Sequence, residues 1–410
     1  MIIKKAFKYR LKVNAEIERQ LNHFSGANRY VWNQALGIQS RRMQREKTCR
    51  KLLTYNMLAW LLTLWKQSNE RSFLNEAPSQ TLQQTLKTLD RAFKDCFDKR
   101  QPNKRFPVFK KKGMKDSFRY PQGFKLNNNQ IFLPKIGWVS FFNSRKIEGE
   151  AKNVTVSRSG KHWYISVQTQ YEVADPIHPS KETVGIDVGV SQFASLSSNE
   201  HLQGKNATKK YAKILSKYQR RLARKQTFSS NWKKEKAKIG KIHTKVADTR
   251  NDRLHWISNK ITTTYETIYL EKLPISNMVR SAKGTVESPG KNVSAKSGLN
   301  KAILDQGWGE FARQLEYKNK WKGGNVQYVD PKYTSQKCRK CHYTSRENRE
   351  SQSKFLCKQC GHTENADINA SYNIKEKGRS GRPSQPAKRI SSRGRQQELV
   401  GNFEKVPCLS

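Results

Sequence analysis

The segment from Cys338 to Ala370 reads Cys338-Arg-Lys-Cys341, then fifteen residues, Cys357-Lys-Gln-Cys360 and, after a short gap, Asn365-Ala-Asp367-Ile-Asn-Ala370. Each Cys-x-x-Cys forms a tight turn, so two of them at this spacing present four sulfurs to one tetrahedral ion. The pattern predicts a structural zinc site on Cys338, Cys341, Cys357 and Cys360, with an iron–sulfur cluster as the alternative. Four thiolates leave no coordination position open to substrate or water. Asp367 follows at the predicted start of a helix that leaves this zinc ribbon.

The chain is strongly basic. Its 410 residues include 80 Lys and Arg against 33 Asp and Glu, which gives a formal net charge of +47. Because this excess is spread along the chain, it predicts a long groove for a polyanion such as nucleic acid. The apolar content of 35%, with nine Trp, 15 Tyr and 17 Phe, is sufficient for packed cores and excludes a disordered polycation. The length fits two or three domains.

The sequence shows no export or membrane signal. Two lysines follow directly after Met1-Ile-Ile, and the longest apolar run, residues 57–65, is too short to cross a bilayer. Three cysteines lie outside the metal pattern, namely Cys49, Cys96 and Cys408, and they do not form a disulfide framework. We therefore expect a reducing, intracellular compartment and no membrane partner. Cys96 is expected in a helix core.

The first 175 residues combine strand and helix patterns. Residues 7–13 alternate apolar and basic side chains, which predicts a half-buried strand, and Asn14 can cap the helix that follows. Residues 14–98 are mostly helical, with breaks near residues 47–51 and 69–78. The clearest helix has an apolar face made of Leu82, Leu86, Leu89, Phe93, Cys96 and Phe97.

A hairpin is predicted downstream of this helical region, because residues 154–167 alternate around Ser159-Gly160. The strand at residues 7–13 has no partner within its own helical region. We therefore expect residues 1–13 and 99–175 to form a small β-barrel, with residues 14–98 as a helical insertion.

Two carboxylates lie in short apolar strands. Asp187 interrupts Val184-Gly-Ile-Asp187-Val-Gly-Val190, and Glu271 ends Thr267-Ile-Tyr-Leu-Glu271. A buried carboxylate is costly unless a cation binds it. The alternative for Asp187 is an acidic residue in a turn between two strands. Residues 205–225, between the two strands, carry nine Lys or Arg on a predicted helix, which we interpret as a nucleic-acid contact rather than a solvated face.

Asp187, Glu271 and Asp367 together suit a two-metal site. Two Mg²⁺ ions about 4 Å apart, or Mn²⁺ in vitro, can activate water and stabilise the leaving oxygen of a phosphodiester. Mg²⁺ prefers oxygen ligands and keeps several waters, so a few carboxylates suffice. In this hypothesis Asp187 bridges both ions, and Glu271 and Asp367 each complete one coordination sphere.

Several segments resemble the TnpB family of transposon-encoded RNA-guided DNA endonucleases, which is related to type V CRISPR effectors. The main segments are residues 184–189, 270–271, 306–311, 333–341 and 365–370. Residues 106–112 and the turn at residues 127–129 are also similar, and the resemblance extends from about residue 3 to residue 377.

The resemblance implies an α+β multidomain protein. An RNase H-like (RuvC) nuclease domain would cover residues 180–377, with a zinc ribbon inserted at residues 330–364, and the small β-barrel would be a wedge carrying a helical recognition insertion. The family's Asp-Glu-Asp centre matches Asp187, Glu271 and Asp367. The implied activity is cleavage of double-stranded DNA next to a short adjacent motif. The implied partner is a guide RNA derived from the transposon end, bound by a monomeric protein.

Two other function classes stay open. Family members that have lost the carboxylates act as guided repressors, but such a repressor would not need the three carboxylates present here. A DNA transposase, or an accessory factor of strand transfer, could use the same acidic centre. Co-purified RNA of one discrete length would favour the guided nuclease.

The helical insertion is expected to read the duplex next to the guided site. Tyr55, Gln83 and Gln84 are the candidates for base or sugar contacts, because Gln can pair with adenine edges and Tyr can stack. Lys87 would contact phosphates. The alternative location is residues 110–122, which contain a further DNA-binding candidate, Arg119. Residues 278–300 form a Gly/Ser-rich basic segment longer than many family lids, and residues 378–410 are expected to be a disordered basic tail.

Overall fold

The computed structural model describes residues 1–44, 52–101, 103–114 and 116–381. The chain divides into two compact units. The first contains Met1–Asp175 and Lys217–Thr244, and the second contains Pro176–Ser216 and the chain from Lys245 onwards. Cys49, Cys408, the break expected near residues 47–51 and the expected tail beyond residue 381 lie outside the described residues.

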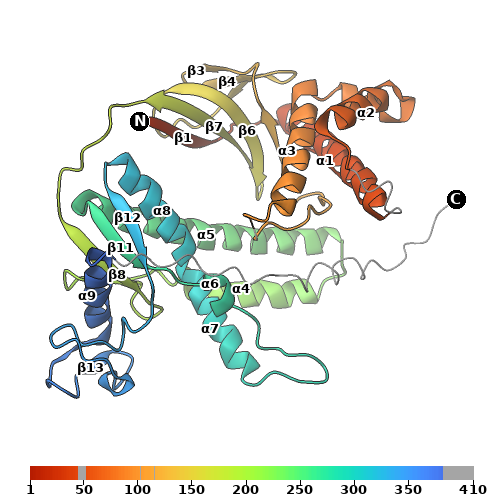
Figure 1. Cartoon of the computed structure of the whole chain (residues 1–410). Helices are drawn as coiled ribbons and strands as arrows, with labels where there is room; N and C mark the ends of the chain where they lie inside the picture. The colour runs from red at the N-terminus through yellow and green to blue at the C-terminus, as the bar shows by residue number, and fades with distance from the viewer. Residues whose placement is uncertain (45–51, 102, 115, 382–410) are drawn as a thin grey trace. The chain divides into compact units, whose positions relative to one another are not determined.

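Two antiparallel sheets form the β part of the first unit, one in the order β1-β7-β6-β2 and one in the order β3-β4-β5 (Figure 1). Their strands are β1 (Ile2–Arg10), β2 (Ser117–Tyr120), β3 (Lys125–Asn127), β4 (Gln130–Leu133), β5 (Gly137–Ser140), β6 (Glu150–Ser159) and β7 (His162–Glu172). Strand β1 pairs with β7, and β6 and β7 form the hairpin around Ser159-Gly160. Both predicted pairings are therefore confirmed.

The first strand differs from its predicted bounds. It begins at Ile2 and ends at Arg10, because Leu11 makes only an isolated bridge to Phe141. The alternation itself is confirmed, since Phe7, Tyr9 and Leu11 are all buried. The ring of Tyr9 lies 5.0 Å from the ring of Phe141, so the two sheets are joined at this point. Closure into a barrel stays a prediction.

The helical part of the first unit lies between β1 and β2. It consists of α1 (Ala15–Gln44), α2 (Tyr55–Gln67), the 3₁₀ helix η2 (Asn69–Asn75) and α3 (Ser79–Phe97). The Asn14 side chain accepts the backbone N–H of Ile17 at 2.8 Å, which confirms the predicted cap. The face of α3 is buried at Leu82, Leu86, Leu89 and Phe93, as predicted.

Two details of the helical region were predicted wrongly. Phe97 is 51% exposed and Cys96 only half-buried, because they form the last turn of α3, where its packed face ends. The break expected at residues 69–78 is largely helical, since η2 occupies residues 69–75.

A five-stranded sheet with the order β10-β9-β8-β11-β12 is the centre of the second unit. Its strands are β8 (Thr183–Val188), β9 (Ala194–Leu196), β10 (His201–Leu202), β11 (Thr267–Glu271) and β12 (Asn325–Val329). Strand β11 runs parallel to both β8 and β12, whereas β9 pairs antiparallel with β8. The apolar runs around Asp187 and Glu271 are therefore strands, as predicted, and β9, the next strand along the chain, pairs with β8 at Asp187.

Helix α9 packs beside β8 and β11 (Figure 1). Two glycines permit this approach. A Cβ at Gly185 of β8 would lie 2.2 Å from the carbonyl oxygen of Ser371, and a Cβ at Gly378 of α9 would lie 2.0 Å from the ring of Tyr269. The helix runs from Ala366 to Arg379, so the tail expected from residue 378 begins with two helical residues.

Further helices and strands lie in the chain's second half, and one of them, α8, packs against β12. They are α4 (Ala207–Ala223), α5 (Ser230–Thr264), α6 (Ile275–Met278), α7 (Val293–Gln306), α8 (Trp308–Trp321), η3 (Arg346–Asn348), β13 (Lys354–Leu356) and β14 (Thr363–Asn365). The basic segment at residues 278–300 is not wholly a loop, since α7 begins at Val293. No helix among the described residues is long and apolar enough to span a membrane.

Candidate carboxylate centre and cysteine site

Asp187 and Glu271 occupy neighbouring positions at the carboxyl ends of two parallel strands. Ile186 of β8 pairs with Leu270 of β11, so the next residue on each strand carries one of the two carboxylates. Asp187 retains partial solvent exposure, but the protein around its carboxylate removes much of its hydration. This desolvation, followed by the negative charges of Glu271 and Asp367, raises the pKa of Asp187 well above its usual value.

Asp367 reaches the same cluster from the first turn of α9. The Asn365 side chain caps this helix by accepting the backbone N–H groups of Asp367 at 3.0 Å and Ile368 at 3.2 Å. Because α9 packs on β8, its first turn brings Asp367 close enough to Asp187 to raise the pKa of that carboxyl. The structure thus places Asp187 near both of the other carboxylates that were singled out from the sequence.

Thr334 holds the carboxylate of Glu271 in place. Its hydroxyl donates to Glu271 Oε1 at 2.5 Å, and its backbone carbonyl accepts the side-chain amide of Asn373 on α9 at 2.8 Å. Burial raises the pKa of Glu271, and the bond from Thr334 opposes that shift. Thr334 therefore connects β11 to α9, and sequence reasoning assigned it no role because 63 residues separate it from Glu271.

Arg349 supplies positive charge to the carboxylates and was also missed. Its Nη2 atom lies 3.5 Å from Asp367 Oδ1 and donates to the carbonyl of Gln352 at 3.0 Å. Desolvation raises the pKa of Asp367, and the Arg349 guanidinium counteracts this, as it does for Asp187 and Glu271. A sequence signal was available, since Arg349 lies between the two cysteine pairs in the segment that precedes Asp367.

The carboxylate centre fits hard divalent cations. Asp187, Glu271 and Asp367 offer oxygen ligands, which Mg²⁺ prefers, and each has a raised pKa because burial disfavours its charged form. A cation beside the three groups would stabilise their ionised forms. The donor chemistry and the electrostatics of this cluster therefore agree with a magnesium site.

The four cysteines form a compact set of sulfurs. Their sulfur atoms all lie within 4.8 Å of one another, with Cys338 Sγ 3.7 Å from Cys360 Sγ and Cys341 Sγ 3.5 Å from Cys357 Sγ. A tetrahedral zinc ion with Zn–S bonds of about 2.3 Å requires sulfur–sulfur distances of about 3.8 Å. The arrangement could therefore hold one zinc ion, and it is too compact for the sulfurs to surround a multi-iron cluster.

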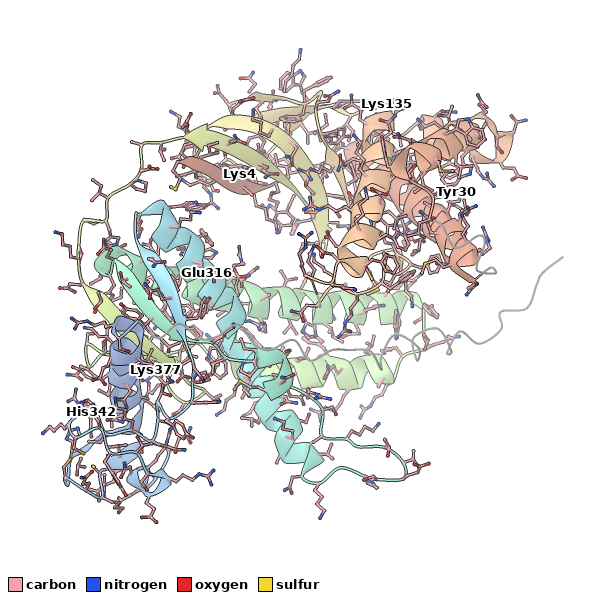
Figure 2. All side chains as sticks on the ribbon, viewed as in Figure 1. Lys4, Tyr30, Lys135, Glu316, His342 and Lys377 are labelled. Atoms are coloured by element: carbon pink, nitrogen blue, oxygen red, sulfur yellow. The ribbon has the colours of Figure 1, made fainter. Side chains whose placement is uncertain are left out.

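The cysteine site is fastened to the helix that carries Asp367. The side-chain amides of Asn369 and Asn373 donate to the carbonyl of Lys337 at 2.8 Å and 2.7 Å, and the Arg339 N–H donates to Asn369 at 3.1 Å. These bonds bracket Cys338, so the position of the first cysteine turn and that of α9 depend on each other. Figure 2 shows Lys377 on α9 and His342 in the adjacent cysteine segment.

The DNA-contact candidates lie in the first unit. Lys87 Nζ of α3 lies 5.1 Å from the ring centre of Tyr55, the first residue of α2, so these two residues meet. Gln83 is exposed and Gln84 is half-buried on α3. Arg119 lies on β2 instead, where it donates to Asn153 at 3.0 Å and Gln168 at 3.2 Å.

Comparison with known proteins gives consistent similarities along the chain. A protein of Escherichia coli (strain K12), “Putative RNA-guided DNA endonuclease InsQ”, is 47% identical over 371 residues, which cover 90% of this chain and 91% of that protein. The chain belongs to the TnpB family. A second TnpB-family relative, from Streptomyces pristinaespiralis, is named “Putative RNA-guided DNA endonuclease” and is 30% identical over 91% of this chain and 89% of that protein.

Three family descriptions match parts of this TnpB-family chain. Residues 166–282 match “Probable transposase”, residues 308–374 match “Cas12f1-like, TNB domain”, and residues 1–48 match “Helix-turn-helix domain”. Within the last range, the described residues form the strand β1 and one uninterrupted helix, α1. The cryo-EM structure of a Cas12f1–sgRNA–target DNA complex shares the fold, with a TM-score of 0.54 and 12% identity, over 91% of this chain and 99% of that chain.

Proposed function

We propose that this protein is an RNA-guided DNA endonuclease of a mobile element, which cuts double-stranded DNA by metal-dependent phosphodiester hydrolysis. The observation that carries the proposal is the convergence of Asp187, Glu271 and Asp367 from β8, β11 and α9 in a member of the TnpB family. A nuclease-inactive repressor would have no use for three carboxylates held together at the cost of raised pKa values.

The proposed domain architecture is the one implied by the resemblance to the TnpB family. Residues 180–377 would be the RNase H-like (RuvC) nuclease domain, with the zinc ribbon at residues 330–364 inside it. Residues 1–13 and 99–175 would be the wedge barrel, and residues 14–98 the recognition insertion. The bridge between Leu11, which follows β1, and Phe141, which follows β5, and the parallel pairing of β11 with β8 and β12 support this division.

When bound at the carboxylates, two Mg²⁺ ions, or Mn²⁺ in vitro, would activate a water molecule and stabilise the leaving oxygen. Asp187, on the central strand, would hold these ions together with Glu271 and Asp367, through the carboxylate oxygens of all three side chains. Thr334 orients Glu271 through its hydroxyl, and the Asn365 cap fixes the turn that presents Asp367. The Arg349 guanidinium favours the charged forms and so partly offsets the rise in the pKa of Asp187 and Glu271. The cysteines would hold one structural zinc ion, which keeps the ribbon and α9 in register.

The nucleic-acid partners would be a guide RNA from the transposon end and a target duplex that carries a short adjacent motif. The net charge of +47 supports a polyanionic partner. Tyr55, Gln83 and Gln84 would contact bases or sugars, and Lys87 phosphates. Arg119, fixed by two hydrogen bonds, is the candidate from the β part of the unit. The ribonucleoprotein would contain one protein copy and act in the prokaryotic cytoplasm, at the nucleoid.

The test is to purify the protein from cells that express the flanking transposon end and to sequence the RNA bound to it. A plasmid library with a guide-matched target and randomised flanks is then incubated with the complex and Mg²⁺. We expect one discrete RNA and cleavage beside a fixed flanking motif, lost with EDTA. Strand-transfer products without bound RNA would identify a transposase instead, and guided binding without cleavage would identify a repressor.

A further inference from the structure

The second unit contains a hollow of about 410 Å³ at the end of its sheet opposite the carboxylates. Strand β8 begins at Thr183, which lines the hollow, and runs toward Asp187 at its other end. The two places are therefore separated by the length of the strand. The hollow is lined by Lys181, Glu182, Thr183, Ser197, Ser198, Tyr265, Lys375 and Arg379.

The close packing of α9 on β8 builds one wall of this hollow. At Gly185 a Cβ would lie only 2.2 Å from the carbonyl oxygen of Ser371 and 2.6 Å from the backbone nitrogen of Lys375, so the helix backbone lies directly against the strand. Lys375 and Arg379 are four residues apart on α9 and therefore share one face of the helix. That face lines the hollow.

The hollow has an excess of positive charge. Among the described residues, the side chains of Lys181, Lys375 and Arg379 make no ion pair and no hydrogen bond within the protein, and Glu182 is the acidic residue of the lining. Three positive side chains and one negative side chain leave two positive charges. Lys377 on the same helix differs, because it donates to the carbonyls of Asp330 and Lys332.

Hydroxyl groups complete the lining. Thr183, Ser198 and Tyr265 each contribute one, and Ser197, which is 5% exposed, accepts the backbone N–H of Gly185 at 3.0 Å and keeps its own proton to donate. Cationic groups beside hydroxyl donors are the groups that bind phosphate oxygens. A stabilising effect on the helix dipole could explain cations near the end of α9. It explains neither Lys181, which precedes β8, nor the hydroxyls.

We propose that this hollow is a second nucleic-acid site, which binds the phosphodiester backbone of an RNA or DNA strand at a distance from the carboxylate centre. The site requires phosphate oxygens and no particular base, because every donor in its lining suits an anion. It goes beyond the proposed cleavage function, since it binds nucleic acid whether or not the carboxylates act.

The test compares the full-length wild-type protein with the triple variant Lys181→Gln, Lys375→Gln and Arg379→Gln. Affinity for labelled single-stranded RNA, single-stranded DNA and duplex DNA is measured in EDTA over about 50–200 mM salt. The plot of log K against log salt has a negative slope, and loss of one phosphate contact should reduce the magnitude of that slope by about 1. At 0.1 M salt the same loss should weaken binding about tenfold. The probe whose slope changes identifies the strand that uses the site.

A charge-matched control separates this site from the overall charge of the chain. Lys283→Gln, Lys291→Gln and Lys301→Gln remove three exposed lysines of the same unit that do not line the hollow. We expect a smaller slope change from this control. Equal changes in both triple variants, or unchanged slopes for all three probes, would overturn the proposal.

Ser198→Glu provides a second variant that leaves the helix cations in place. Ser198 is exposed, so a glutamate there adds a negative charge to the hollow without disturbing a packed side chain. Weaker binding with an unchanged melting temperature supports the phosphate site. Wild-type affinity in Ser198→Glu, with its fold intact, would count against it.

Discussion

Replacing Thr334 by Val should slow cleavage without weakening guided binding. The Thr334 hydroxyl donates to Glu271 Oε1 at 2.5 Å, and Val has nearly the same shape but no hydroxyl. A hydrogen bond to a charged group contributes about 1.5–3 kcal/mol. If that energy orients Glu271 in the transition state, its loss lowers the cleavage rate by about 10- to 150-fold, since about 1.4 kcal/mol corresponds to a factor of ten. The buried position of Thr334 leaves no water to replace the hydroxyl easily.

The assay is single-turnover cleavage of a labelled target duplex by the guide-loaded protein, over a range of Mg²⁺ concentrations. Thr334→Ser is the matched control, because it keeps the hydroxyl and should retain most of the rate. In Thr334→Val the half-saturating Mg²⁺ concentration should also rise, since Glu271 would be a less well-oriented ligand. A Thr334→Val rate within about threefold of wild type at every Mg²⁺ concentration would refute the positioning of Glu271 by Thr334.

Three further predictions test other parts of the assignment. Asp187→Ala should abolish cleavage and leave guided binding nearly intact, as a gel-shift assay beside the cleavage assay would show; near wild-type cutting in Mg²⁺ would mean that the centre lies elsewhere. Native mass spectrometry should find one zinc ion in the wild-type protein, and Cys338→Ser should lose that ion, melt at lower temperature and cut slowly, because metal binding contributes folding energy; iron, or an active preparation without metal, would contradict this. Gln83→Ala and Gln84→Ala should alter the preferred adjacent motif in a randomised-flank library, and if neither changes the motif or the rate, recognition lies elsewhere, with residues 110–122 as the next candidate.

Local sequence patterns identified each of the three carboxylates as a site candidate, but they did not predict that the three lie close together in the fold. Asp187 and Glu271 were found because short apolar runs around them have strand character, and Asp367 because it lies at the predicted start of a helix after the cysteine pairs. Their proximity depends on the parallel pairing of β8 with β11 and on the packing of α9. Neither contact has a local signal, since the partners lie far apart in the chain. The hypothesis that the three groups meet came from the chemistry of a two-metal site and from the family resemblance.

Local sequence patterns gave even less information about the residues that contact the carboxylates. Thr334 and Arg349 lie within residues 330–364, the predicted zinc ribbon, yet each acts on a carboxylate of another element. The sequence indicates their charge or hydroxyl but not the direction of the side chain. Phe97 shows the opposite error. The helical spacing correctly placed Phe97 on the apolar face of α3, but the buried part of that face ends one turn earlier, at Phe93. Periodicity assigns a side, and tertiary contacts decide how far along the helix that side is covered.

Helix α9 connects the cysteine site, the carboxylate centre and the hollow. This connection predicts which variants should change nucleic-acid binding and which should change cleavage. Asn369 and Asn373 fasten the helix to the cysteine turn, Asp367 lies in its first turn, and Arg379 ends it. Twelve residues separate Asp367 from Arg379, which corresponds to about 18 Å along the helix at 1.5 Å per residue. One strand of a duplex advances about 3.4 Å per nucleotide, so about five nucleotides would separate the cut phosphate from a phosphate in the hollow on the same strand. Variants of the hollow should therefore weaken binding while leaving the cleavage rate of the bound complex unchanged, whereas loss of the cysteine site, which displaces the whole helix, should reduce both.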